Sequence, residues 1–157
     1  MVRVCFVCLG NICRSPTAEG IMIDLVKKQN LEKEIQIDSS GTSAYHVGEP
    51  ADHRSQATAN HHGIHLPSRA RQFRPEDFTK FDYVVAMDLA NYNHLMNQRT
   101  QNNQKVYLLR QFDPQSPDKA SVPDPYYGGA KGFDQVFNIC LKGCEGLLKE
   151  IKNSYNL

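Results

Sequence analysis

Short apolar runs and longer stretches with helical periodicity alternate along this chain. Residues 2–8 form an apolar run that a single arginine interrupts, which is typical of a buried strand. Pro16 suits the first turn of the helix that should follow. The apolar residues of that helix recur on one face, at Ala18, Ile21, Met22, Leu25 and Val26. The chain therefore begins with a strand, a loop and a helix.

The same alternation continues to the C-terminus. Further strands are predicted at residues 35–38, 83–87 and 106–109. Further helices are predicted at 55–62 and, after Asp88 as an N-terminal cap, through about Met96. The clearest signal is an apolar stripe at i, i+3, i+4 and i+7 spacing near the C-terminus, which predicts a long amphipathic helix. Its members are Phe133, Val136, Phe137, Cys140, Leu141, Cys144, Leu147, Leu148 and Ile151.

Strands that alternate with helices favour an α/β fold with a mainly parallel sheet and helices on both of its faces. In such folds, ligands bind beyond the carboxyl ends of the strands. The length suits one domain that spans residues 1–157. Residues 110–132 break the pattern, because they contain four of the eight prolines and form a long irregular segment. A loop of that length inside a compact domain is usually functional.

The charges and the cysteines restrict the class of protein. Lysine and arginine total 18 against 17 aspartate and glutamate, and a formal net charge of +1 argues against a general binder of nucleic acids or anionic membranes. The pattern contains neither a targeting segment nor an apolar stretch that could span a membrane. The five cysteines are an odd number and lack the regular spacing of a disulfide framework. We therefore expect reduced thiols in a cytoplasmic protein.

The strongest chemical signal is the loop at residues 8–16, Cys-Leu-Gly-Asn-Ile-Cys-Arg-Ser-Pro. A loop that leads into a helix N-terminus presents unpaired backbone N–H groups and the positive end of the helix dipole, so it can bind an anion. Gly10 permits a tight turn, and Arg14 can offer a planar fork to two phosphate oxygens. The same positive field favours the thiolate of Cys8, to which Ser15 can donate a hydrogen bond. The alternative is a core cysteine and a surface arginine, but the glycine inside the loop and the Ser-Pro after it argue against that interpretation.

A phosphoryl-transfer nucleophile also needs a general acid to protonate the leaving oxygen. Residues 1–7 contain no Asp, Glu or His, so such an acid has to follow Cys8 in the chain. Asp124 is a candidate, because it lies between two prolines in the irregular segment and close to two tyrosines. An aspartate before a proline is equally suited to start a turn, and the residues alone leave both interpretations open.

The string Val-Cys-Leu-Gly-Asn-Ile-Cys-Arg-Ser-Pro resembles the signature loop of the low-molecular-weight protein tyrosine phosphatases. The resemblance extends along almost the whole chain, because further segments follow in the order of the family. These are Ile37-Asp38-Ser39, His46-Val47-Gly48, His62-Gly63-Ile64, Ala70-Arg71-Gln72, Glu76-Asp77-Phe78, Phe81-Asp82-Tyr83, Met87-Asp88 and Asp124-Pro125-Tyr126-Tyr127.

This resemblance implies a single domain with a four-stranded parallel sheet flanked by helices. It implies that Cys8 is the nucleophile, Arg14 the phosphate clamp and Asp124 the general acid. Asn11, Ser15 and Ser39 would hold the loop in its anion-binding shape. The phosphate-binding residues would be Leu9, Gly10, Asn11, Ile12, Cys13, Arg14 and Ser15.

The implied activity is metal-independent hydrolysis of phosphotyrosine in proteins and of small aryl phosphates, through a cysteinyl-phosphate intermediate and without a cofactor. The partners would be those phosphoproteins or aryl phosphates, with no nucleic acid and no membrane, and we expect a monomer or a weak dimer. Tyr45, Tyr126 and Tyr127 could line a slot that stacks on the aryl group. Relatives often carry Trp in place of Tyr45, and some animal members carry a histidine that supports the loop asparagine in place of Ser68. These two departures leave the substrate range and the loop support open.

The loop also contains a second cysteine, Cys13, which predicts redox control. An accessible thiolate such as Cys8 is readily oxidised to sulfenic acid, and a nearby thiol can condense with it to a disulfide. Members of the resembled family are similar in carrying this second loop cysteine.

Two other functions have to be weighed. Arsenate reductases use the same loop but need further cysteines, and none lies between residues 88 and 109. A catalytically silent phosphotyrosine-binding module would not need Cys8, Arg14 and Asp124 together.

Several remaining motifs favour packing over chemistry. Cys5 and Cys8 lie three apart on a strand and should point to opposite faces, and Cys140 and Cys144 lie on an apolar helix face. The histidines at residues 61, 62 and 65 have no neighbouring cysteine or carboxylate to complete a metal site. The glycine-rich residues 128–132 predict a flexible turn.

Overall fold

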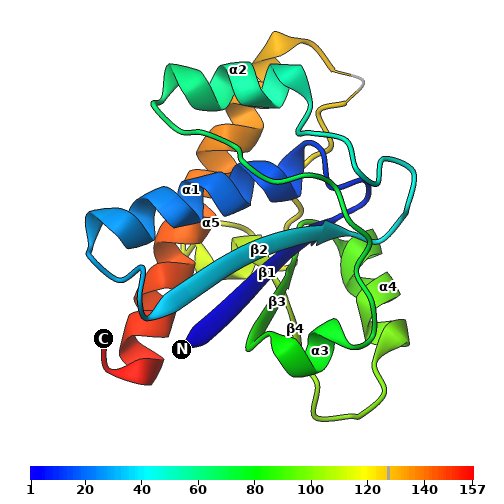
Figure 1. Cartoon of the computed structure of the whole chain (residues 1–157), viewed down its shortest axis with the longest axis vertical. Coiled ribbons are helices and arrows are strands. Elements are labelled where there is room, and N and C mark those ends of the chain that lie inside the picture. Colours follow the sequence, from blue (N-terminus) through cyan, green and yellow to red (C-terminus); the bar gives the residue numbers. More distant parts are fainter. Residues whose placement is uncertain (127) are drawn as a thin grey trace.

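A four-stranded parallel sheet with helices on both faces forms the centre of the molecule (Figure 1). This computed structural model describes residues 1–126 and 128–157. The strands are β1 (Val2–Cys8), β2 (Ile35–Gly41), β3 (Tyr83–Ala86) and β4 (Val106–Leu108), and they lie in the order β2-β1-β3-β4. The fold class predicted from the alternation of strands and helices is therefore confirmed.

Two groups of helices cover the two faces of this sheet. One face packs against α1 (Arg14–Lys28) and α5 (Ala130–Tyr155), with α2 (His53–His61) resting on those two helices. The other face packs against α3 (Asp77–Lys80) and α4 (Leu89–Gln98), and a 3₁₀ turn, η1 (Leu109–Phe112), follows β4. Figure 1 shows that both chain termini lie near the end of the sheet where the strands begin. The carboxyl ends of the strands are thus left for the loops that carry the candidate chemistry.

The central strand β1 contributes side chains to both hydrophobic cores. Val4, Phe6 and Cys8 face α1 and α5, whereas Cys5 and Val7 face the α3 and α4 side. This alternation follows from the two-residue period of a strand. Cys5 and Cys8 therefore lie on opposite faces, as their spacing predicts.

The observed boundaries differ from the predicted ones where tertiary contacts decide them. The strand predicted at 35–38 extends to Gly41, because its last residues pair with the end of β1 up to Cys8. The helix predicted at 55–62 begins at His53, since the Asp52 carboxylate accepts a hydrogen bond from the Arg54 backbone N–H and caps it.

Three further elements depart from the sequence pattern. Helix α3 has four residues, too few to produce a visible period. The last predicted strand residue, Leu109, opens η1 instead. The expectation of a flexible turn at residues 128–132 is wrong in part, because α5 begins at Ala130. No helix in the described part of the chain is long and apolar enough to cross a membrane.

Candidate active site

The loop between β1 and α1 curls around the sulfur of Cys8, the last residue of the strand. Asn11 adopts the left-handed backbone conformation, with φ of 58°. Asparagine tolerates this conformation better than most residues with a Cβ atom. As a result, the Asn11 backbone N–H points back and donates to Cys8 Sγ at 3.3 Å. The hydroxyl of Ser15, in the first turn of α1, lies 3.0 Å from the same sulfur.

The side chain of Asn11 fixes this curl from below. Its amide nitrogen donates to Ser15 Oγ at 2.8 Å and to Ser39 Oγ on β2 at 2.9 Å. Its amide oxygen accepts from the Arg71 backbone N–H at 3.0 Å. All three polar positions of the Asn11 amide group are therefore used, which locks the loop to β2 and to the segment before α3.

Gly41 allows the end of β2 to touch the loop. A Cβ atom at this position would lie 2.8 Å from the Leu9 carbonyl oxygen and 3.2 Å from the Asn11 backbone nitrogen. Both neighbours are backbone atoms and cannot move without deforming the loop. The position therefore requires a residue without a side chain.

Arg14 is buried in the first turn of α1, beside the loop. Nη1 donates to Asp88 Oδ2 at 2.6 Å and to the Val122 carbonyl oxygen at 3.1 Å. Nη2 lies 3.6 Å from Asp124 Oδ2. Burial alone would lower the pKa of Arg14, but the negative charges of Cys8, Asp88 and Asp124 raise it above its ordinary value. Arg14 therefore stays a cation, and the two hydrogen bonds of Nη1 fix the orientation of its guanidinium group.

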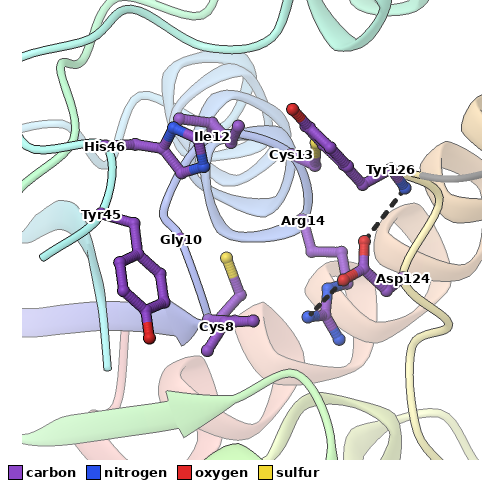
Figure 2. A pocket seen from close by; sticks show the side chains of 10 residues that line it. Cys8, Gly10, Ile12, Cys13, Arg14, Tyr45, His46, Asp124 and Tyr126 are labelled. Carbon is purple, nitrogen blue, oxygen red and sulfur yellow. Dashed lines mark hydrogen bonds and ion pairs between the residues drawn. The ribbon is translucent and has the colours of Figure 1, made fainter. Parts of the chain in front are cut away.

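Asp124 lies beside Arg14, in the loop before α5 (Figure 2). One carboxylate oxygen accepts a hydrogen bond from the Tyr126 backbone N–H at 3.0 Å, and the other faces Arg14. The side chain is 42% exposed, so the carboxyl group can reach both solvent and a bound ligand.

These residues surround a pocket of about 370 Å³ above the sulfur of Cys8. Figure 2 shows the Cys8 sulfur directed into the pocket, with Tyr45 and His46 on one side and Tyr126 and Asp124 on the other. The lining residues are Cys8, Leu9, Gly10, Ile12, Cys13, Arg14, Tyr45, His46, Asp124 and Tyr126. A thiol, a cation and a carboxyl group thus converge at a helix N-terminus, an arrangement suited to an anionic ligand.

The family model of the low molecular weight phosphotyrosine protein phosphatases matches residues 3–156. The chain belongs to this family. The low molecular weight protein tyrosine phosphatases are hydrolases, and the resemblance seen in the signature loop is thereby confirmed.

Two solved structures and one sequence relative illustrate the match. The low molecular weight phosphotyrosine protein phosphatase of Rattus norvegicus is 43% identical over 150 residues, which cover 94% of each chain. A protein tyrosine phosphatase from Entamoeba histolytica superposes with a TM-score of 0.93 at 37% identity and covers 99% of both chains. A Drosophila protein described as an arginine phosphatase superposes with a TM-score of 0.88 at 34% identity, over 95% of this chain and 97% of its own.

Most of the residues that the sequence predicts for the active site of this phosphatase family member lie together in or under the pocket. Cys8, Arg14 and Asp124 meet in the pocket, and Ser39 contacts Asn11 under the loop. Tyr45 borders the pocket but is 81% exposed, so it stands at the mouth. Tyr127, expected in the same wall, lies outside the described residues.

Three polar residues beside the phosphatase loop were not predicted to belong to the site. His46 lines the pocket and its Nδ1 lies 2.8 Å from Glu49 Oε2. Asp88, predicted as a helix cap and present in one of the shared segments, anchors Arg14. Glu19 lies under the loop and accepts from Ser39. For His46 and Asp88, membership of the shared segments was the only available signal.

The remaining cysteines are buried thiols. All five cysteines lie in the described part of the chain and are free. Burial raises the pKa of Cys5 and of Cys140 to about 12, which makes both unreactive. Within residues 1–126 and 128–157, no group of three His, Cys, Asp or Glu side chains converges in a way that could hold a metal ion.

Proposed function

We propose that this protein hydrolyses phosphotyrosine in proteins, and small aryl phosphates, through a cysteinyl-phosphate intermediate and without a metal cofactor. The observation that carries this proposal is the position of Cys8 Sγ at the base of the pocket, with Arg14 and Asp124 facing the same space. The names of the curated relatives support the same activity.

In the first step, the Cys8 thiolate attacks phosphorus and the bond from phosphorus to the phenol oxygen breaks. Asp124 gives its proton to that oxygen, so that the leaving group departs as a neutral phenol. Arg14 and the backbone N–H groups of the loop stabilise the equatorial oxygens. Because Asp88 and Val122 hold Nη1, the guanidinium can meet the phosphoryl group without first losing freedom of rotation.

In the second step, the Asp124 carboxylate takes a proton from water as the water oxygen attacks phosphorus. The bond from sulfur to phosphorus breaks, and inorganic phosphate and the Cys8 thiolate are released. The Ser15 hydroxyl, 3.0 Å from Sγ, can donate to the sulfur as its negative charge returns.

The pocket walls favour an aryl substrate. Ile12, Tyr45 and Tyr126 offer apolar and aromatic surface against which a phenyl ring can stack. The similar Drosophila structure raises phosphoarginine as a second substrate class. Among the described lining residues, Asp124 is the only carboxylate that could accept from a guanidinium group, and its role here is that of an acid. We therefore place phosphotyrosine first.

Parallel assays of the purified protein in the presence of EDTA test this function. We expect turnover of p-nitrophenyl phosphate and of a phosphotyrosyl peptide, with kcat/KM for phosphoarginine at least about tenfold lower, a factor typical of one mismatched pocket contact. Activity only in a thioredoxin-coupled arsenate assay would show a reductase instead. Tight binding of the phosphotyrosyl peptide without turnover would show a silent binding module.

The proposal also covers the domain organisation, oligomeric state, compartment and partners of the protein. We propose that residues 1–157 act as one phosphatase domain, as a monomer or weak dimer in the cytoplasm, without nucleic-acid or membrane partners. Five free cysteines suit a reducing compartment, and the net charge of +1 offers no general attraction to polyanions.

Cys13 supports a proposal of redox protection. Peroxide converts the Cys8 thiolate to a sulfenic acid, and the Cys13 thiol then condenses with it to form a disulfide and water. Burial raises the pKa of the Cys13 thiol to about 12, with the charge of Asp52 adding to this effect, so Cys13 stays protonated near neutral pH. We expect mild peroxide to inactivate the enzyme, thiol reductant to restore it, and bound phosphate to protect it.

The Cys13→Ser variant tests this role. After equal peroxide exposure, it should recover a smaller share of its own untreated activity, because Cys8 can advance to sulfinic acid. Cys144→Ala, which removes a thiol from α5 far along the chain, should recover like the parent. Full recovery of the Cys13→Ser variant would contradict the proposal.

A further inference from the structure

A buried carboxyl group lies beneath the phosphate loop and has no part in the steps described above. Glu19, on α1, is 4% exposed. Its Oε1 accepts two short hydrogen bonds, from Ser39 Oγ at 2.7 Å and from Ser68 Oγ at 2.6 Å. Ser68, whose part in supporting the loop the sequence leaves open, thus bonds to Glu19. Burial raises the pKa of the Glu19 carboxyl, although the two serine hydroxyls act in the opposite direction.

The number of protons on each group fixes the direction of the hydrogen bonds that start at Glu19. A serine hydroxyl has one proton, and Ser39 gives its proton to the carboxyl group. Ser39 can therefore only accept from the Asn11 amide nitrogen, which lies 2.9 Å away. The Asn11 amide cannot turn over, because its oxygen already accepts from the Arg71 backbone N–H.

The second proton of the Asn11 amide nitrogen points to Ser15 Oγ at 2.8 Å. Ser15 therefore accepts from Asn11 and keeps its own proton for another partner. The Cys8 sulfur, 3.0 Å away, is closer than the competing Ser40 carbonyl oxygen at 3.3 Å. A hydroxyl that donates to a thiolate stabilises it both as nucleophile and as leaving group.

We propose that Glu19 is a positioning residue that directs the Ser15 proton to Cys8 through Ser39 and Asn11, with Ser68 holding the carboxyl group in place. The inference rests on the proposed function of Cys8. Without the Glu19 acceptor, the Ser39 hydroxyl can turn its proton toward the Asn11 amide nitrogen, which is itself a donor. Ser39 then no longer accepts from Asn11, and the donor-to-acceptor direction along the chain of hydrogen bonds is lost. The sulfur would then lose a donor while the pocket walls stay intact.

The experiment compares Glu19→Leu, which removes the acceptor, with Glu19→Gln, which keeps a carbonyl oxygen. We expect the Leu variant to lose roughly tenfold in kcat for p-nitrophenyl phosphate, the effect of about one hydrogen bond, and the Gln variant to retain most of the activity. KM should change less than kcat, because the groups that bind phosphate are untouched. Asp24→Leu, which removes a partly exposed carboxylate paired with Lys28 on the same helix, is the matched control and should behave like the parent.

A second measurement separates positioning from a structural role. The rate at which iodoacetate alkylates Cys8 is followed against pH, and the midpoint of this profile should move upward in Glu19→Leu and stay close to the parent in Glu19→Gln. Glu19→Asp, which withdraws the carboxyl group by one methylene, should give the same upward shift if the Leu variant fails to fold. A folded Leu or Asp variant with the parent's kcat and alkylation profile would overturn the proposal. Absence of turnover in the parent would instead overturn the proposed function.

Discussion

Replacing Cys8 by serine is expected to reduce turnover of p-nitrophenyl phosphate by a factor on the order of 10⁴ or more, as is typical for loss of a covalent nucleophile. A serine hydroxyl stays protonated in a field that favours a thiolate, so it attacks phosphorus poorly. The anion site should survive, because Arg14 and the loop N–H groups do not depend on the sulfur. We therefore expect inorganic phosphate still to bind, as measured by calorimetry.

Two outcomes would contradict this expectation. Residual turnover near the parent level would mean that another residue attacks phosphorus. Loss of phosphate binding together with turnover would mean that Cys8 shapes the loop rather than acting in it. Cys144→Ala controls for the removal of a thiol elsewhere and should keep full activity.

Replacing Asp124 by alanine is expected to slow poor leaving groups by about 10²–10⁴-fold and activated leaving groups much less, because a general acid matters most where the departing oxygen is most basic. The measurement is kcat/KM across a series of substituted phenyl phosphates, since this ratio includes the departure of the phenol. The slope against leaving-group basicity should steepen in the variant.

The control is Asp118→Ala, an exposed aspartate in the same irregular segment. It should leave the slope unchanged. Equal slowing across the whole series in Asp124→Ala would exclude Asp124 as the acid and would point to a role in binding through its contact with Arg14.

Local patterns were enough to predict the sheet, the loop and the helix that follows it. The apolar run of β1, the glycine and arginine of the loop, and Pro16 lie within fifteen residues of one another, so their order can be read as one short pattern. Asp88 shows the limit of prediction from local sequence patterns. Its position before a helix predicts a cap, and the structure confirms that its carboxylate accepts from the Asn91 backbone N–H. Its bond to Arg14, 74 residues away in the chain, has no local signal.

The burial of Glu19 could not be predicted from the sequence for a different reason. It follows Ala18 on the amphipathic helix, where a glutamate beside the apolar stripe normally faces water. In the fold, Ser39 and Ser68 lie over Glu19 and donate hydrogen bonds to it from two separate segments. The same contacts therefore bury the carboxyl group and provide its hydrogen-bond donors. A single sequence does not record which distant polar residues will meet.

The phosphate loop, residues 8–15, is held in place by contacts from residues 39, 41, 71, 88 and 122, which are distant from it in the chain. An anion in the loop binds the native chain and has no corresponding site in the unfolded one. By mass action, such a ligand shifts the folding equilibrium toward the native state by about 2.7 kcal/mol when its concentration is 100 times its dissociation constant. Inorganic phosphate, the product of the proposed reaction, would in this way stabilise the fold that releases it.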